Sequence, residues 1–293
     1  MKARKFVQVD VFTNRACLGN PVAVVTDAQD LSDDDMQTIA RWTNLSETTF
    51  LLPSTDPNAD YRLRIFTPRA ELPFAGHPTL GSLFAAIKCG LIQPKQGRWT
   101  QQCQIGLIEL SGDQEQGFFL RLPEPQFKTF DRQQVQQILA SIGASGTSTS
   151  ASIDTVAQVS IGASWITVQL PSAQEVLTLQ PDQAAVALLS ERNNATGITV
   201  FGAYALDAAT NQPVAGYEVR SFAPAHGVDE DPVCGSGNGS VALLLAKHGR
   251  RTDYRARQGR AIGRDGFIQV KYRDGATFIG GQCVAVVEGT IHY

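Results

Sequence analysis

The sequence has little of what marks several common classes of protein. It has five cysteines among 293 residues, an odd number without CxxC spacing, which argues against a disulfide framework and a cysteine-based zinc site. The net charge of −3 shows no excess of basic residues, so neither nucleic acids nor anionic membranes are expected partners. No run approaches the roughly 20 apolar residues of a membrane helix, and the N-terminus has strand-like alternation instead of a secretory signal. These absences predict a cytoplasmic globular protein.

Short strand-like runs make up most of what is present, and helices are few. Alternating or apolar runs bounded by turn residues predict strands, for example over 5–12, 21–26, 48–52, 61–66, 164–170 and 216–222. Helices are expected over 31–42 with Ser32 as N-cap, from about 78 to 89, over 181–192 with Pro181 in the first turn, and over 238–249. A small, polar segment at 144–152 predicts a loop. Two of the helices are apolar all round and require burial on every side, which predicts an α+β fold with sheet wrapped around helix.

An internal repeat relates the two halves of the chain. The stretch that begins at Glu71 (ELPFAGHPTLGSLFAAIKCG) matches the stretch that begins at Glu230 (EDPVCGSGNGSVALLLAKHG), and the offset of 159 positions holds without a gap. Each copy contains a glycine-bearing turn followed by one of the apolar helices. We therefore expect two similar domains, each a barrel-like sheet around a central helix, related by pseudo-twofold symmetry. Their expected limits are 1–125 and 126–282.

The two apolar helices begin at glycine-containing segments that are suited to anions. A helix N-terminus presents unpaired backbone N–H groups and a partial positive charge. If both helix starts face one cleft between the halves, the turns at Gly76 and Gly235 hold a carboxylate there. The alternative is that these glycines only permit a tight turn into a packed helix. A nucleotide phosphate is not expected, because GSGNGS does not fit the P-loop pattern.

Three titratable residues are candidates for acid–base chemistry or substrate binding. Glu47 lies between the end of a helix and an apolar strand, where partial desolvation would raise its pKa toward a value useful for acid–base chemistry. His77 lies at the first helix start, and Asp231 precedes the second. Each has a structural alternative: Glu47 and His77 could cap helices or loops, and Asp231 could be a solvated turn carboxylate. At the position of His77 the second copy has Ser236, so the scaffold is symmetric while its side chains are not.

Four motifs resemble one known family. They are LGNPVAVV at 18–25, NLSETTF at 44–50, IFTPRAELPFAGHPTLG at 65–81 and DEDPVCGSG at 229–237. In order and along nearly the whole chain they resemble the PhzF family of phenazine-biosynthesis-like isomerases, which has the diaminopimelate epimerase fold. The resemblance implies an isomerase that needs no metal or organic cofactor, acts on a small carboxylate and forms a homodimer. It also implies that the last strand, 283–293, packs back onto the first domain, as in that fold.

The resemblance also assigns roles to residues. Glu47 corresponds to the glutamate that moves a proton between two carbons of trans-2,3-dihydro-3-hydroxyanthranilate. His77, Asp231 and Ser236 correspond to the residues that bind the substrate. Asn20, within the first motif, is a further candidate.

Cys234 departs from the family pattern, which usually has threonine there. Related epimerases and racemases use two thiols, one to remove a proton and one to return it. The partner position here is Ala75, so that pair is absent. At a helix N-terminus the pKa of Cys234 is expected to be lowered. An epimerase that uses Cys234 and Glu47 is therefore an alternative, and a non-catalytic binding protein that kept the cleft is another. Cys234 could also be only a small residue at a position where threonine would fit as well.

Overall fold

The computed structural model describes residues 1–93, 95–144, 155–205 and 215–293. These residues form two compact units. Unit 1 contains Met1–Arg121 and Gly280–Tyr293, and unit 2 contains Leu122–Ile279. The limits predicted from the sequence, 125 and 282, fall a few residues later. From residue 145 on, the predicted loop at 144–152 lies outside the described residues.

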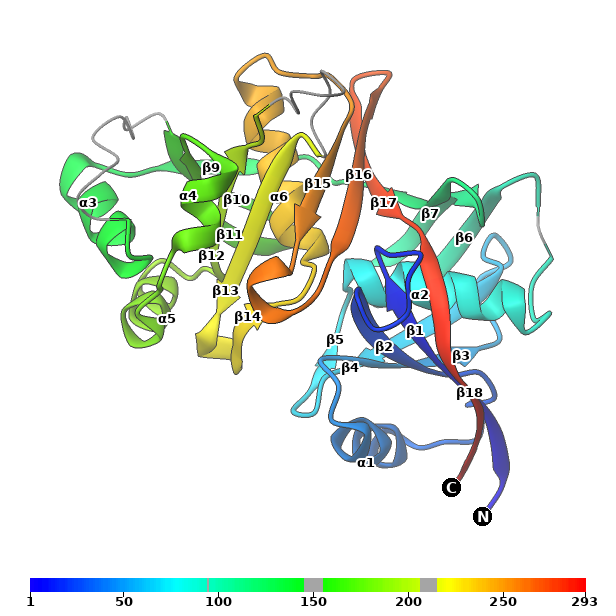
Figure 1. Cartoon of the computed structure of the whole chain (residues 1–293). Helices are drawn as coiled ribbons and strands as arrows, with labels where there is room; N and C mark the ends of the chain where they lie inside the picture. Colours follow the sequence, from blue (N-terminus) through cyan, green and yellow to red (C-terminus); the bar gives the residue numbers. More distant parts are fainter. Residues whose placement is uncertain (94, 145–154, 206–214) are drawn as a thin grey trace. The chain divides into compact units, whose positions relative to one another are not determined.

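Unit 1 is a curved sheet with one helix against its concave side. Its strands are β1 (Ala3–Val11), β2 (Asn20–Val25), β3 (Thr48–Leu52), β4 (Tyr61–Phe66), β5 (Glu71–Leu72), β6 (Arg98–Cys103), β7 (Gly106–Asp113), β8 (Gly117–Arg121) and β18 (Cys283–His292). Its helices are α1 (Asp33–Thr43) and α2 (Gly76–Lys88). Neighbouring strands run antiparallel except for the parallel pairs β2–β3 and β4–β6. Helix α2 contacts β1, β2, β3, β4, β8 and β18 (Figure 1).

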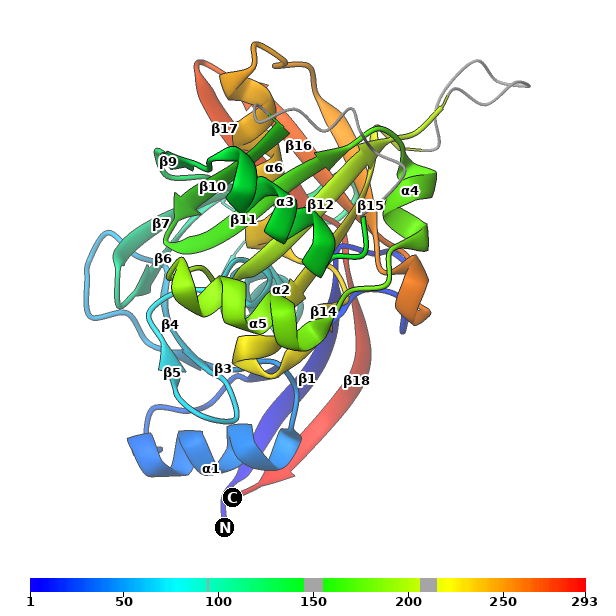
Figure 2. The same ribbon diagram turned by 90° about the vertical axis from the view of Figure 1, so that its left-hand side faces the viewer.

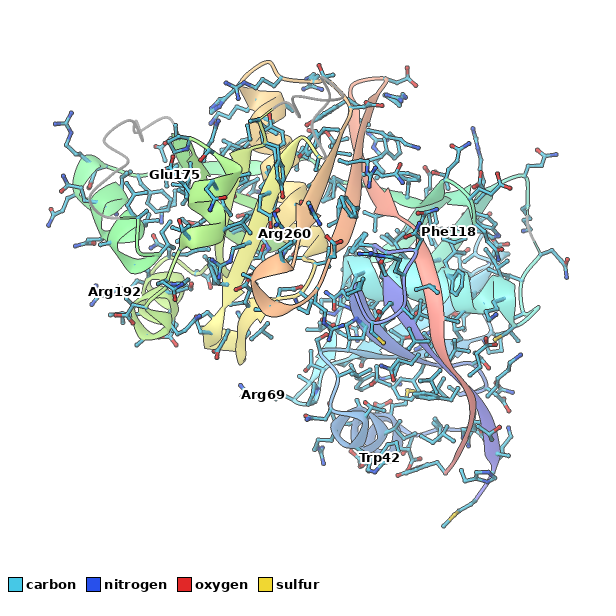
Figure 3. The ribbon with its side chains drawn as sticks, in the orientation of Figure 1. Trp42, Arg69, Phe118, Glu175, Arg192 and Arg260 are labelled. Atoms are coloured by element: carbon cyan, nitrogen blue, oxygen red, sulfur yellow. The ribbon has the colours of Figure 1, made fainter. Side chains whose placement is uncertain are left out.

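The two helices of unit 1 differ because their sequences differ. Helix α1 buries only one face, and Ser32 caps its N-terminus through a capping box with Asp35, which confirms the predicted cap. Helix α2 is buried along most of its length, and Gly81 lets it approach β2 closely: a Cβ there would lie 2.5 Å from Cγ1 of Val22. Phe118 of β8, labelled in Figure 3, adds aromatic packing. Its ring meets that of Trp99 edge to face, with 5.9 Å between the ring centroids.

Unit 2 repeats this plan with additional helices. Its strands are β9 (Gln126–Thr129), β10 (Val156–Ile161), β11 (Ala163–Leu170), β12 (Gly197–Ala203), β13 (Tyr217–Ala223), β14 (Val228–Asp231), β15 (Tyr254–Gln258) and β16 (Gly266–Arg273), and β17 (Ala276–Gly281) spans the limit between the units. Its helices are α3 (Arg132–Ser141), α4 (Ala173–Thr178), α5 (Gln183–Arg192) and α6 (Gly235–Lys247), with 3₁₀ turns at Pro224–His226 and Arg260–Ile262.

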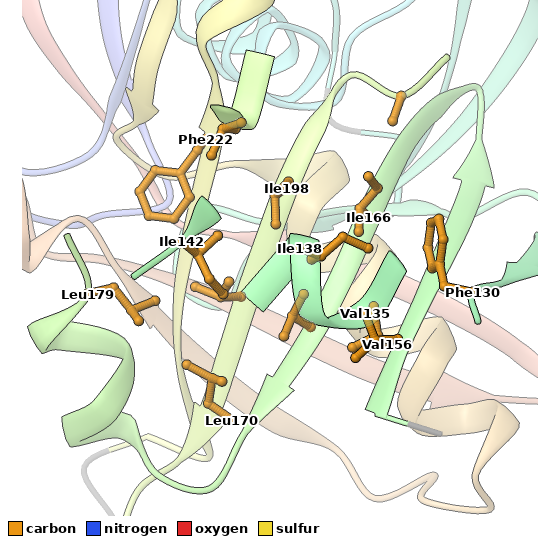
Figure 4. Packing of buried hydrophobic residues seen from close by; sticks show 14 of the residues in the cluster. Phe130, Val135, Ile138, Ile142, Val156, Ile166, Leu170, Leu179, Ile198 and Phe222 are labelled. Atoms are coloured by element: carbon orange, nitrogen blue, oxygen red, sulfur yellow. The ribbon is translucent and has the colours of Figure 1, made fainter. Parts of the chain in front are cut away.

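The connectivity of unit 2 matches that of unit 1 strand by strand. The parallel pairs are β11–β12 and β13–β15, and α6 takes the place of α2. Helices α3, α4 and α5 cover the opposite face of the sheet (Figure 2). They enclose a core that contains Phe130, Val135, Ile138, Ile166, Ile198 and Phe222 (Figure 4). The predicted fold class, two similar barrel-like units each built around one helix, is confirmed.

Some local expectations were wrong. Helix α6 begins at Gly235 and not at 238, because the glycines of this segment adopt helical backbone instead of a separate turn. Asp182 caps α5, so Pro181 lies before the helix and not in its first turn. Helices α3 and α4 were not predicted, and α4 has only six residues. No helix within the described ranges is long and apolar enough to cross a membrane.

Candidate active site

The end of helix α1 places Glu47 beside the central helix of unit 1. The helix stops at Asn44, whose left-handed backbone (φ 53°) turns the chain toward β3. Glu47 directly precedes this strand, and its backbone carbonyl accepts a hydrogen bond from Ala23 N–H of β2 at 3.3 Å. Backbone pairing with β2 therefore fixes the point from which the Glu47 side chain leaves the sheet.

Glu47 and His77, thirty residues apart in sequence, meet in the structure. Glu47 Oε2 lies 3.3 Å from His77 Nε2, and the two side chains are 15% and 8% exposed. Burial raises the pKa of Glu47 from an ordinary 4.5 to about 7, and a hydrogen bond from Ser46 opposes part of that rise. A carboxyl group with a pKa near neutrality can both accept and return a proton at physiological pH.

The sequence gives His77 its place at the start of α2. It is the second residue of the helix, and no side chain caps this N-terminus. The first-turn N–H groups therefore have no capping side-chain acceptor. A Cβ on Gly76 would meet only Leu120 Cδ2, at 3.8 Å, so packing does not require glycine at that position. Asn20, the other candidate in unit 1, begins β2 and is 1% exposed.

The second group of predicted residues gathers at the start of α6 in unit 2. Cys234 is the N-cap, and its Sγ accepts a hydrogen bond from Gly237 N–H at 3.3 Å. Ser236 Oγ lies 3.6 Å from this sulfur and accepts a hydrogen bond from Trp165 Nε1–H at 2.9 Å. Asp231 ends β14 just before, and its Oδ1 accepts a hydrogen bond from the N–H of Val233 at 3.1 Å.

The expectation of a lowered pKa at Cys234 was wrong. The side chain is 3% exposed, and burial together with the nearby Asp231 carboxylate raises the pKa of the thiol well above its ordinary value. The hydrogen bond from Gly237 N–H favours the thiolate, but it does not outweigh these two effects. The helix N-terminus therefore does not make this cysteine a ready base.

Sequence reasoning missed the amide that holds the second segment in shape. Gln258, 1% exposed on β15, accepts hydrogen bonds from Cys234 N–H at 3.1 Å and Asn238 Nδ2 at 2.7 Å. Its Nε2 donates to the carbonyl of Asp231 at 2.9 Å. Asn238 was a detectable signal, because it is the one amide in a helix of mainly small and apolar residues. Gln258 was not, because nothing in its local sequence sets it apart.

Glu71 and Glu230, which begin the repeated stretches, have the same structural role in both units. Arg64 donates two hydrogen bonds to Glu71, at 2.8 and 2.7 Å. Arg220 donates two to Glu230, at 3.0 and 2.7 Å. The second pair is almost fully buried, with side chains 7% and 8% exposed. These bidentate pairs fix the strand that precedes each helix start, so neither glutamate is available as a base.

Glu218 is a second buried carboxyl group with an unusual pKa. It is fully buried on β13, where it accepts a hydrogen bond from Tyr204 O–H. Burial raises its pKa to about 7. Arg220 is two residues further along β13, so the two side chains lie on the same face of the sheet. The Arg220 guanidinium donates hydrogen bonds to backbone carbonyls of α4 and of Leu179, which follows α4. Glu218 is therefore on the face opposite α6 and apart from Cys234 and Ser236. No group of three or more metal-ligating side chains is found within the described residues.

Comparison with known proteins identifies relatives along the whole chain. The family model described as "Phenazine biosynthesis-like protein" matches residues 9–289. A Schizosaccharomyces pombe protein named antisense-enhancing sequence 1 is 37% identical over 301 aligned residues, which cover 99% of both chains. The trans-2,3-dihydro-3-hydroxyanthranilate isomerase of Pseudomonas aeruginosa is 33% identical, over 97% of this chain and 98% of its own.

Solved structures show the same fold. A PhzF-family protein from Bacillus anthracis superposes with a TM-score of 0.86 at 26% identity and full coverage of both chains. A protein described as a probable proline racemase, from Agrobacterium radiobacter, has a TM-score of 0.62 at 13% identity, with 99% of this chain and 93% of that chain covered. At that identity the second likeness concerns the fold alone.

Proposed function

Because the chain belongs to the phenazine biosynthesis-like (PhzF) family of isomerases, we propose that it moves a proton within a small cyclic or amino-acid-like carboxylate, with Glu47 as general acid and base. The observation that carries the proposal is the buried Glu47 carboxyl group, whose pKa is about 7 and which lies 3.3 Å from His77. At that pKa the carboxylate and the carboxylic acid are both populated at neutral pH, as a proton shuttle requires.

The reaction then needs one group and returns it unchanged. The Glu47 carboxylate removes a proton from one substrate carbon, and the resulting carboxylic acid delivers that proton to another carbon. Bonding electrons move within the substrate, so no oxidant or reductant is consumed. His77 orients the carboxyl group and contacts the substrate on the same side.

The proposed substrate class is a carboxylate with a second polar group. The helix start at Gly235 and the hydroxyl of Ser236 supply donors for an anionic oxygen, and Asp231 supplies an acceptor for an amine or hydroxyl. The first compound to test is trans-2,3-dihydro-3-hydroxyanthranilate, on which the Pseudomonas aeruginosa relative acts by its name.

The epimerase alternative would require Cys234 to act as a base opposed to Glu47. The raised pKa and deep burial of the Cys234 thiol weigh against it, because a thiol must ionise to remove a proton. We therefore propose a single-base isomerase and retain the Cys234→Ala variant as its test.

The experiment is proton NMR in D2O with the purified protein, trans-2,3-dihydro-3-hydroxyanthranilate and a panel of amino-acid stereoisomers. We expect rearrangement of the dihydro compound, a rate that rises with pH through about 7, and loss of at least 100-fold in Glu47→Gln but not in Cys234→Ala. Exchange of an amino-acid α-proton that Cys234→Ala abolishes would establish the epimerase. Ligand binding without exchange at any carbon would establish a binding protein.

A further inference from the structure

Unit 2 has no carboxyl group at the position that Glu47 occupies in unit 1. Phe66 and Phe222 lie at or next to the ends of equivalent strands, each two residues after the arginine of the bidentate pair. The residue paired with each phenylalanine on the neighbouring strand directly follows Glu47 in unit 1 and Gly197 in unit 2. Gly197 is therefore the counterpart of Glu47.

An indole ring fills the space beside this glycine. Trp165 on β11 is paired with Gly197 in the parallel β11–β12 ladder. A Cβ on Gly197 would lie 2.8 Å from Cζ3 of Trp165 and 2.0 Å from the carbonyl oxygen of Phe222, so no larger residue fits. Trp165 is 2% exposed and packs against Cys234. The missing side chain thus makes room for the indole.

The indole N–H contacts the counterpart of His77. Trp165 Nε1 lies 2.9 Å from the Oγ of Ser236, which is 159 positions after His77. In unit 1 the counterpart of Ser236 is His77, and its contact is with Glu47 instead: His77 Nε2 lies 3.3 Å from Glu47 Oε2. The scaffold therefore places a carboxyl–imidazole contact in one unit and an indole–hydroxyl contact in the other.

The chemistry of this contact fixes the direction of the Ser236 hydroxyl. An indole N–H can only donate, so Ser236 Oγ accepts from Trp165 and must direct its own proton elsewhere. The nearby Cys234 sulfur, 3.6 Å away, is a weak acceptor that already receives the Gly237 N–H. An oxygen of a bound ligand is a better acceptor for the Ser236 proton than this sulfur.

We propose that Trp165 is a positioning residue that, through its indole N–H, sets Ser236 as a donor to an oxygen of the bound carboxylate. Trp165 itself is buried, whereas Ser236 is partly exposed, so the tryptophan acts through the serine. The inference deepens the proposed function and rests on it for the identity of the substrate.

The test is a double-mutant cycle with Trp165→Phe, Ser236→Ala and the double variant. The phenylalanine keeps an aromatic ring in the space and removes the N–H together with part of the bicyclic ring, so a control for the lost packing is needed. We expect about a tenfold rise in KM for trans-2,3-dihydro-3-hydroxyanthranilate and in the Kd of anthranilate for each single variant, with kcat changed less. Both single variants remove the same hydrogen bond from the Ser236 hydroxyl to the ligand. The double variant should therefore lose no more affinity than Ser236→Ala alone. Additive losses would overturn the proposal.

The matched control is Trp99→Phe in unit 1. Trp99 is also buried, at 4% exposure, and donates its indole N–H to the Gln93 carbonyl at 3.0 Å. It should leave KM and Kd unchanged. If Trp99→Phe weakens binding as much as Trp165→Phe, the effect is one of general packing and the proposal fails.

Indole NMR separates failure of this inference from failure of the proposed function. The Trp165 N–H signal, assigned by its loss in Trp165→Phe, should move in Ser236→Ala and on addition of anthranilate, whatever compound is turned over. The Trp165 signal can move, and the changes in anthranilate Kd can be non-additive in the double-mutant cycle, even if no compound rearranges. In that case the positioning role of Trp165 stands and the isomerase proposal is wrong. If Trp165→Phe does not fold, Trp42→Phe and Trp99→Phe assign the other two indole signals and leave the third to Trp165. An unmoved Trp165 signal in Ser236→Ala then still overturns the inference.

Discussion

Glu47 shows how position gives a common residue uncommon chemistry. A glutamate is ordinarily ionised at neutral pH, but here the chain leaves it between a helix end and a strand start, with 15% of its side chain exposed. Loss of hydration disfavours the charged form and raises the pKa to about 7. His77, brought to 3.3 Å by the first turn of α2, then meets a carboxyl group that can exist in both protonation states.

This burial predicts a pH-dependent cost in stability. The folded state holds the Glu47 proton up to pH 7, whereas the unfolded chain releases it near 4.5, so folding loses stability as pH rises through that window. We expect Glu47→Gln to remove this loss and to be more stable than the natural protein above pH 7, by up to about 3 kcal/mol. Urea unfolding at pH 4, 6 and 8 measures the difference. The stability of Glu218→Gln is measured for comparison, because burial also raises the pKa of Glu218 to about 7. A change in the free energy of unfolding on Glu47→Gln that does not vary with pH would contradict the burial argument.

The thiol of Cys234 should react slowly. It is buried and its pKa is raised, so little thiolate is available and reagents have poor access to it. We expect iodoacetamide at pH 8 to label Cys234 at least 100-fold more slowly than the exposed Cys17 of the same chain, as followed by peptide mass spectrometry. Comparable rates of labelling would mean that the Cys234 thiol is activated, and they would support the epimerase alternative.

At the scale of elements, the start of helix α6 depends on glycines, which have no side chain to collide with the sheet. A Cβ on Gly237 would lie 2.5 Å from Ser221 Oγ and 2.7 Å from Thr199 Oγ1. These two hydroxyls are themselves hydrogen-bonded at 3.0 Å and buried on neighbouring strands. The glycines allow the helix to begin directly against the sheet, which brings its N-terminal N–H groups to the candidate site.

The contrast between two glycines provides a prediction. Gly237→Ala should destabilise the protein by about 1–3 kcal/mol, because the new methyl group meets hydroxyls that have little room to move. Gly76→Ala should cost little, since its Cβ would meet only Leu120 Cδ2, at 3.8 Å. Thermal unfolding of both variants measures the difference. If both lose equal stability, contact with the sheet is not what requires glycine in α6.

At the scale of the whole molecule, one connectivity occurs twice and carries different side chains. Each unit has the same parallel pairs, the same central helix and the same bidentate arginine–glutamate pair. Unit 1 adds Glu47 and His77, and unit 2 adds Trp165 and Ser236. The repeat supplies two equivalent scaffolds, and substitution within them places different side chains at the two helix starts.

The last strand returns to unit 1 and should matter there specifically. Strand β18 pairs with β1 from Ala3 to Val11. Deletion of residues 283–293 exposes those backbone groups, so we expect faster amide exchange in β1 and β2 and continued protection in β10–β13. Hydrogen exchange with mass spectrometry measures both. Glu288→Gln, which removes only a surface ion pair with Lys88, should leave the exchange unchanged. Equal loss of protection in both units would show that they do not unfold separately.

The sequence by itself determined the repeat, the buried character of two helices and the residue types at their starts, because these are local or periodic features. It also singled out Glu47 and His77 as unusual, although no spacing rule brings residues thirty positions apart to 3.3 Å. Short α4 and the polar strands after α6 escaped prediction, because too few residues carry their pattern.

Only the tertiary structure decided what the site residues experience. The pKa of Cys234 is raised and not lowered, because burial and the Asp231 carboxylate outweigh the effect of the helix N-terminus. The partnership of Trp165 with Gly197 and Ser236 depends on strand register and on a packed helix start. Burial and register are properties of long-range packing, and a local reading of the chain does not contain them.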